Sequence, residues 1–269
     1  MKVVCLFSIC LLFSISTFSQ VSKTEVKLLW SDEFEQDGLP NLSKWSLEVG
    51  DHGWGNNELQ LYTSGQFKNA RVQGGVLLVE AHADASQPKG YTSAKLVSKG
   101  KGAWQYGYVE VRAKLPQGRG TWPAIWMLPE VNNFGGWPKS GEIDIMEHVG
   151  YDPGTVHGTV HTEAFNHLLG TQKGGKLVVP NFASEFHTYA VDWKKDQMDF
   201  YIDGKHYFSF KNTGNGYQEW PFDQPFYLIL NLAVGGNWGG KEGVDASIWP
   251  QRMEVDYVRV YKQNPQLHP

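Results

Sequence analysis

The chain has 269 residues, 41% of them hydrophobic, and a formal net charge of −4 at pH 7. Such a chain can build one sizeable globular core. The mildly acidic balance excludes a basic surface of the kind that binds nucleic acid or an anionic membrane.

The first 20 residues have a composition unlike that of the rest of the chain. Lys2 gives a positive start, an apolar run covers residues 3–18, and small residues follow at 16–19. This pattern predicts a secretory signal peptide over residues 1–20, with a retained N-terminal anchor as the alternative. After cleavage we expect a secreted protein, extracellular or periplasmic, that makes no membrane contact.

Both cysteines, Cys5 and Cys10, lie inside this predicted leader. The mature chain is therefore expected to have no disulfide, no thiol catalysis and no cysteine-ligated zinc. Loss of Lys2 would reduce the basic residues from 24 to 23, against 28 acidic ones, so the mature protein stays mildly acidic.

Residues 21–269 contain no repeat, low-complexity tract or linker, and we interpret them as a single catalytic domain. Strand patterns dominate this domain. In residues 108–115, Val109, Val111 and Ala113 share one face, and polar side chains occupy the other. Further strands are predicted at 70–73, 76–81, 121–128, 198–202, 205–210 and 253–261.

Short strands separated by glycine and proline define the predicted fold class. Asp203-Gly204, between two of these strands, is a strong hairpin signal. Helical periodicity is nearly absent. The chain is therefore predicted to be all-β, an antiparallel two-sheet β-sandwich of jelly-roll (concanavalin-like) type with an open substrate cleft, and the strand order is left open.

The segment 141–150 concentrates three acidic residues. Glu142 and Asp144 share one face of the predicted strand, and the intervening isoleucines point to the core. Glu147 follows Glu142 by five positions, so a regular strand would bury it in the core, where an unpaired carboxylate is costly. A β-bulge at Ile145 or Met146 would return Glu147 to the side of the other two.

Three carboxylates on one patch repel each other, and this crowding raises the pKa of at least one of them. One can then act as an ionised nucleophile and another as a protonated acid. Glu142 and Glu147 would flank a glycosidic bond at about 5–5.5 Å, the separation of retaining glycosidases, and Asp144 would assist. The alternatives are a solvated acidic strand edge, which the buried isoleucines disfavour, and a calcium site, which would prefer a loop with more oxygen ligands.

This segment resembles the bulged Glu-x-Asp-x-x-Glu signature of glycoside hydrolase family 16, in particular that of bacterial laminarinases, the endo-β-1,3-glucanases. The resemblance covers nearly the whole mature chain, with further landmarks at 29–34, 54–60, 118–129 and 255–261. It implies that Glu142 is the nucleophile, Glu147 the acid/base and Asp144 the assisting carboxylate. Water completes the reaction, so no cofactor is expected for catalysis.

Tryptophans and polar side chains are expected to bind the sugar chain. Eleven tryptophans suit sugar faces, although a sandwich core could also use such rings. Period-2 alternation places Trp122 and Trp126 on the cleft face, and His161 is expected near the acid/base. His157 is expected to be structural, because four strand residues span about 13 Å and the two histidines cannot share a metal. By resemblance, the other sugar contacts are Trp137, Asn57, Glu110, Arg112 and Asn231, with an exposed cross-strand pair as the alternative for Glu110 and Arg112.

The resemblance further implies a structural calcium ion on the convex side of the sandwich, far from the cleft. Its expected ligands are Glu33, a carbonyl at Gly75 and Asp256.

We therefore expect a secreted endo-acting enzyme that cleaves internal β-1,3-glucosidic bonds of laminarin-type β-glucan with retention. It is expected to be monomeric, with β-glucan polysaccharide or oligosaccharide as its partner. The alternatives are a mixed-linkage β-1,3-1,4-glucanase, an agar- or carrageenan-cleaving relative, and a non-catalytic β-glucan-binding protein. Sulfated galactans would demand a cationic cleft, and a non-catalytic protein would lack the carboxylates.

Overall fold

The structure of the protein, a computed structural model, describes Met1 and residues 26–267. Apart from Met1, the predicted signal peptide over residues 1–20 lies outside the described residues. Within them, strands form two sheets, and the one helical element is the 3₁₀ turn η1 (Pro265–Leu267). None of the described helical structure is long and apolar enough to cross a membrane. The predicted all-β class is confirmed.

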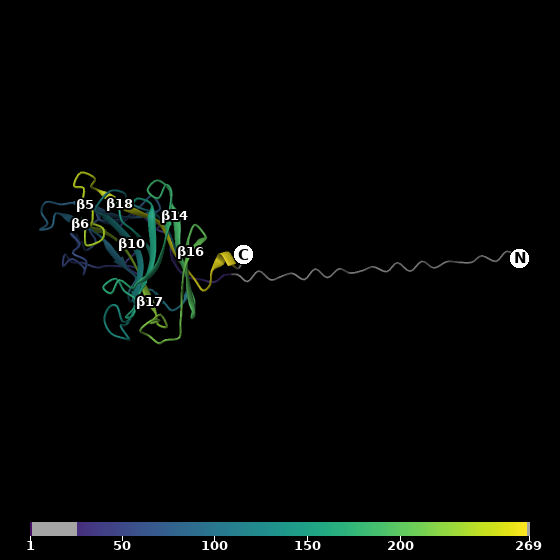
Figure 1. The fold of residues 1–269 in the computed structure, drawn as a ribbon. Helices are drawn as coiled ribbons and strands as arrows, with labels where there is room; N and C mark the ends of the chain where they lie inside the picture. Colours follow the sequence, from purple (N-terminus) through teal and green to yellow (C-terminus); the bar gives the residue numbers. More distant parts are fainter. Residues whose placement is uncertain (2–25, 268–269) are drawn as a thin grey trace.

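The first sheet has ten strands. Figure 1 shows several of them, β5, β18 and β14, above β10 and β17 of the second sheet. From one edge to the other, the order is β16 (Lys205–Lys211), β15 (Gln197–Ile202), β14 (His187–Trp193), β9 (Gly107–Lys114), β18 (Gln251–Tyr261), β5 (Val76–Ala83), β6 (Tyr91–Ser93) and β3 (Gln60–Tyr62), with β1 (Leu28–Asp32) beside β18 and β4 (Ala70–Gln73) beside β5.

The second sheet has eight strands and carries the carboxylate segment at its centre. Its order is β13 (Lys173–Val178), β12 (Thr155–His161), β11 (Glu142–His148), β10 (Thr121–Pro129), β17 (Phe226–Val234), β7 (Lys95–Val97) and β2 (Ser46–Leu47), with β8 (Ala103–Trp104) beside β17. Every strand pair in the two sheets is antiparallel except β3 with β6, which pair in parallel.

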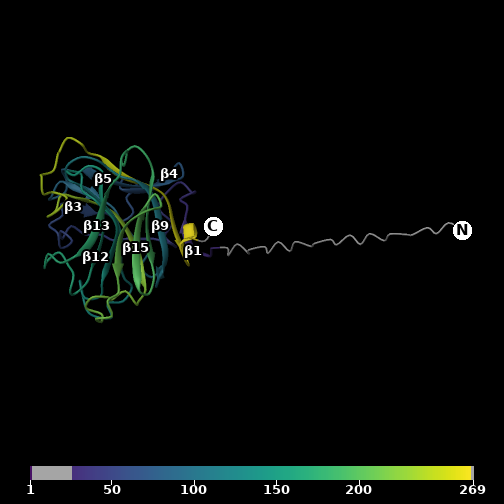
Figure 2. The same cartoon turned by 45° about the vertical axis from the view of Figure 1, so that its right-hand side comes forward.

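The core fills the space between the two sheets, as the alternation of apolar residues predicts. Val109, Val111 and Ala113 on β9 are buried, and so are Ile125 and Met127 on β10. In Figure 2, the labelled strands β9, β12, β13 and β15 run roughly alongside one another, as in an aligned sandwich. Apolar burial between these faces is the main term that stabilises the fold.

The hairpin between β15 and β16 has the predicted turn. Asp203 has φ 50° and Gly204 φ 72°, so both central residues lie in the left-handed region. Such a turn matches the right-handed twist of the flanking strands, and Asp-Gly adopts it at low cost.

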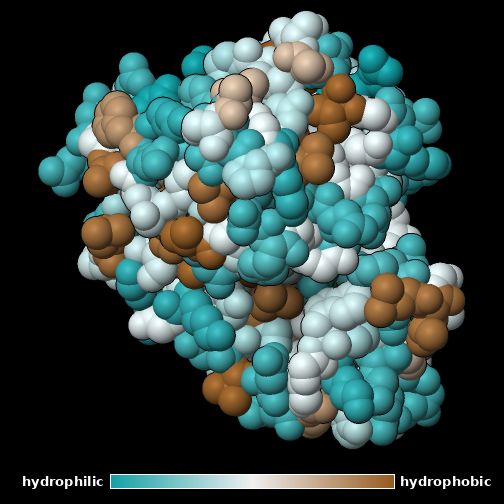
Figure 3. Space-filling model, turned by 90° about the vertical axis from the view of Figure 1, so that its left-hand side faces the viewer, coloured by the Kyte–Doolittle hydropathy of each residue, from teal (hydrophilic) through white to brown (hydrophobic). Residues whose placement is uncertain are grey.

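The outer surface is mixed rather than dominated by one apolar area. Figure 3 shows one face, on which hydrophobic side chains form separate patches among hydrophilic ones. The cleft described next lies on the outward face of the eight-stranded sheet, because its lining residues come mainly from β10, β11, β12 and β17.

Candidate active site

A β-bulge in β11 brings the three carboxylates to one side. Asp144 pairs with Thr159 on β12 and Glu147 pairs with His157, so residues 145–146 face a single residue of β12. Both bulge residues are fully buried, while Glu142, Asp144 and Glu147 all line the cleft. The predicted bulge is confirmed.

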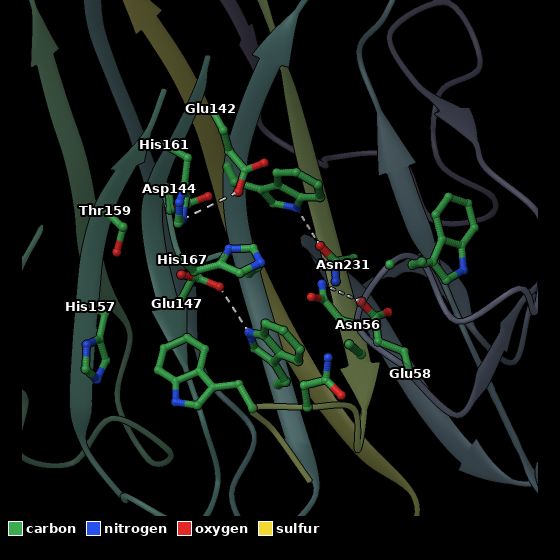
Figure 4. Close-up of a pocket in the computed structure, with 18 of the residues that line it drawn as sticks. Asn56, Glu58, Glu142, Asp144, Glu147, His157, Thr159, His161, His167 and Asn231 are labelled. Atoms are coloured by element: carbon green, nitrogen blue, oxygen red, sulfur yellow. Dashed lines mark hydrogen bonds and ion pairs between the residues drawn. The ribbon is translucent and has the colours of Figure 1, made fainter. Parts of the chain in front are cut away.

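The cleft has a volume of about 530 Å³ and is lined on both sides of the carboxylates. Figure 4 shows Glu142, Asp144 and Glu147 projecting from β11 between His161 on one side and Asn231 on the other. Trp122, Ala124 and Trp126 of β10 line it as well, which is the face that period-2 alternation predicts. The distance between Glu142 and Glu147 stays a prediction.

Glu142 is held by one indole and faces one imidazole. Trp137, at the edge of the cleft and 39% exposed, donates its indole N–H to Glu142 Oε2 at 2.8 Å. His161 Nε2 lies 3.9 Å from Glu142 Oε1. Burial, and then the neighbouring Asp144, raise the pKa of Glu142 to about 8, although His161 and Trp137 act in the opposite direction.

Glu147 accepts a hydrogen bond from the Trp122 indole N–H at 3.1 Å. Burial raises the pKa of Glu147 to about 7, and Glu142 adds to this, whereas His161 and Trp122 lower it. Asp144 is 2% exposed, and burial followed by repulsion from Glu147 raises its pKa well above the usual value. Because these carboxyls interact, they titrate as a group that holds protons near neutral pH, so one member can be protonated beside an ionised neighbour.

One half of the cleft is a hydrogen-bonded polar network with aromatic walls. Trp126 donates its indole N–H to Asn231 Oδ1 at 2.7 Å, and Asn231 Nδ2 donates to the Tyr62 hydroxyl at 2.9 Å. The Lys95 ammonium lies over the rings of Trp54 and Trp126, 4.2 and 5.1 Å from their centroids. Tyr62, Lys95 and Trp54 were not predicted as contacts, although Trp54 opens one of the landmark segments.

The other half of the cleft contains three histidines and a tryptophan. His161 lines it as predicted, and so does His157, which meets Trp238 edge-on at 5.1 Å. His157 therefore lies in the cleft, and the prediction that it is structural stays a prediction. His157 lies four residues before His161, so strand alternation alone places both on one face. His167 comes from the loop after β12, where no periodic pattern could have found it.

Four of the predicted sugar contacts do not line the cleft. Trp137 lies at its edge, where its indole donates to Glu142. Asn57 is exposed and donates to Asn237, which does line it, at 2.9 Å. Glu110 and Arg112 lie on β9 of the ten-stranded sheet, so the prediction that they contact sugar in the cleft is wrong. Glu110 accepts a hydrogen bond from the Tyr257 hydroxyl at 2.8 Å.

Two of the predicted calcium ligands, Glu33 and Asp256, are paired with arginines in the structure. Arg259 donates to both carboxylate oxygens of Glu33, at 3.1 and 2.8 Å, and Arg112 pairs with Asp256. Each carboxylate is thus paired with an arginine, and a calcium ion held by Glu33, the Gly75 carbonyl and Asp256 stays a prediction. In the part of the chain that the structure describes, the one group of three metal-capable side chains is Glu142, Asp144 and His161.

A pair of glutamates with raised pKa values, set in an aromatic cleft on a β-sandwich, defines a glycoside hydrolase. The sequence model of glycosyl hydrolases family 16 matches residues 54–259, and the chain belongs to this family. Hydrolysis by this family needs no cofactor.

Characterised relatives agree with this assignment. The chain is 54% identical to a β-glucanase of Rhodothermus marinus, over 88% of this chain and 85% of that protein. The solved structure of the laminarinase from Rhodothermus marinus has a TM-score of 0.87 and 53% identity, covering 89% of this chain and 98% of that one. A non-specific endo-β-1,3(4)-glucanase, solved with 1,3-β-D-cellobiosyl-glucose at its active site, has a TM-score of 0.85 and 48% identity, covering 89% and 96%.

Proposed function

We propose that this protein is an endo-acting retaining hydrolase of internal β-1,3-glucosidic bonds in laminarin-type β-glucan. The observation that carries the proposal is the bulge in β11, which aims Glu142 and Glu147 into one cleft. The relatives named above, a laminarinase among them, support the β-1,3 linkage. The cleft is lined on both sides of the carboxylates, so a glucan chain can be bound on both sides of the bond that is cleaved, as endo action requires.

In this mechanism, the Glu142 carboxylate attacks the anomeric carbon while Glu147 gives its proton to the departing glycosidic oxygen. A covalent glycosyl ester on Glu142 results, and Glu147 is left ionised. Glu147 then takes a proton from water, whose oxygen displaces Glu142 at the same carbon. Two inversions give net retention, and both glutamates return to their starting states. Asp144 lines the cleft between the two glutamates and is the assisting carboxylate.

Azide rescue tests the two roles separately. Glu142→Ala should lower kcat at least about a thousandfold, and azide should restore turnover of an activated aryl β-glucoside with an α-glycosyl azide as product. Glu147→Ala should instead accumulate the ester and give the β-glycosyl azide. Full hydrolysis by Glu142→Ala, or the reverse stereochemistry, would contradict the assignment.

A mixed-linkage activity is the second candidate, because one close structural relative is a non-specific endo-β-1,3(4)-glucanase. Incubation with laminarin, curdlan, lichenan and agarose, with the products resolved by size, separates the candidates. Cleavage of laminarin and curdlan with little action on lichenan supports the first proposal. Equal rates on lichenan support the second.

We further propose that the chain is exported with removal of residues 1–20 and acts as a monomer. The positive start and apolar run of the leader support export. N-terminal sequencing of the exported protein and its mass in solution test both statements.

A further inference from the structure

We propose that Glu142, Asp144 and His161 form a binding site for a zinc-type divalent cation, and that its occupancy switches the enzyme off. This goes beyond glucan hydrolysis, which uses no metal. The site would take Zn²⁺ reversibly, through one oxygen of each carboxylate and one imidazole nitrogen. Figure 4 shows these three side chains turned toward one another at one end of the carboxylate row.

The distances suit a small tetrahedral ion. The three ligand atoms lie within 4.8 Å of one another. His161 Nε2 is 3.3 Å from Asp144 Oδ2 and 3.9 Å from Glu142 Oε1. Tetrahedral zinc with bonds of about 2.0–2.2 Å separates adjacent ligand atoms by about 3.4 Å. The two distances from His161 lie within about 0.5 Å of this spacing, so small side-chain shifts would bring the ligand atoms to one ion.

The ligand atoms are also available for a metal. Trp137 occupies Glu142 Oε2, which leaves Oε1 on the side of His161. Asp144 is 2% exposed, and its buried Oδ2 accepts no hydrogen bond; its ion-pair neighbour at 3.3 Å is His161 Nε2, the other proposed ligand. An unpaired buried carboxylate oxygen is costly, and a cation that it could bind would relieve this cost.

The donor set selects the kind of ion. Carboxylate oxygen and imidazole nitrogen are both ligands that zinc accepts, and many zinc sites bind three protein ligands and leave a fourth position open. Calcium would demand six to eight oxygens, so it should bind poorly here. The fourth position would face the cleft, since all three residues line it.

Inhibition follows from the identity of one ligand. Glu142 is the proposed nucleophile, and a metal on its Oε1 would occupy the electron pair that attacks the anomeric carbon. Zinc and glucan should therefore compete. Removal of the metal by a chelator should restore the original rate, because no covalent bond is formed or broken.

Zinc binding is tested by calorimetry on the full chain with zinc chloride and no sugar. The wild type should bind one Zn²⁺ that EDTA removes, and calcium chloride should give no comparable binding. His161→Gln and Asp144→Asn should each lower zinc affinity at least about tenfold. The matched control is His157→Gln, which changes a cleft histidine outside the cluster and should keep wild-type zinc affinity.

Hydrolysis assays complete the test. Zinc should inhibit the wild type and His157→Gln equally, and His161→Gln should need at least about ten times more zinc for the same fractional inhibition. No saturable zinc binding, equal loss in His157→Gln, or binding without inhibition would each overturn the proposal. Calorimetry needs no substrate, so zinc binding can be measured whatever the enzyme hydrolyses. A protein that binds zinc but does not hydrolyse laminarin would refute the proposed function and not the zinc site.

Discussion

Each of the two proposed catalytic glutamates accepts one indole N–H, and these two contacts are not equivalent. Trp137 holds Glu142 from the edge of the cleft, whereas Trp122 holds Glu147 from β10, the strand next to β11. A hydrogen bond donated to an ionised carboxylate stabilises the charged form and lowers its pKa. Trp122 is therefore expected to lower the pKa of Glu147 and so to limit the pH range in which this acid stays protonated.

Trp122→Phe should move the alkaline limb of the kcat/KM profile to higher pH. Burial raises the pKa of Glu147 and the Trp122 indole lowers it, so loss of this donor should raise that pKa further. The rate at the optimum should fall about fivefold, for about 1 kcal/mol of lost hydrogen bonding. Trp126→Phe is the control, because its indole donates to Asn231, and its alkaline limb should not move. An unchanged limb in Trp122→Phe would refute this role.

At the scale of elements, alternation explains which site residues could be predicted and which could not. Period-2 alternation places Trp122 on the cleft face of β10 and Ile125 on the core face, as the structure shows. The odd separation of Glu142 and Glu147 likewise predicts the bulge before Glu147. The same rule placed Glu110 and Arg112 on a polar face, but alternation cannot say which sheet bears the cleft. Loop residues such as His167 have no periodicity, so only the folded chain brings them to the site.

The parity argument makes a prediction about the length of β11. Deleting Ile145 leaves Glu147 four positions after Glu142, so a regular strand would still present all three carboxylates on one face. Inserting one alanine after Ile145 makes the separation six positions. This is again even, but it places the two glutamates about 7 Å further apart along the strand than four positions do, too far for both to reach one glycosidic bond. We expect the deletion variant to fold and retain measurable hydrolysis, and the insertion variant to lose it.

The deletion also removes a fully buried isoleucine, which should cost about 2–4 kcal/mol of unfolding free energy. Thermal unfolding and laminarin hydrolysis, measured on both variants, check the argument. Activity in the insertion variant equal to that in the deletion variant would show that the spacing of the two glutamates along β11 does not control hydrolysis.

At the scale of the whole molecule, the carboxylate cluster couples stability to pH. The pKa of Glu142 is raised by burial to about 8 from its usual value of 4.5, and Glu147 is raised to about 7. Between pH 4.5 and 8 the folded protein therefore holds more protons than the unfolded chain. Unfolding free energy should fall as pH rises through this window. Ionised carboxylates are more stable in the solvated unfolded chain than buried in the folded protein.

Glu142→Gln removes one of these titrations, since an amide stays neutral at every pH. At pH 8 the variant should be more stable than the wild type by about 1–3 kcal/mol, which raises the unfolding midpoint by about 2–10 °C. At pH 4.5, where the wild-type carboxyl keeps its proton, the two midpoints should nearly coincide. The exposed Glu35→Gln serves as control and should follow the wild type throughout. A stability gain that does not depend on pH would mean that Glu142→Gln differs from the wild type through packing. The buried charge of Glu142 would then not destabilise the folded protein.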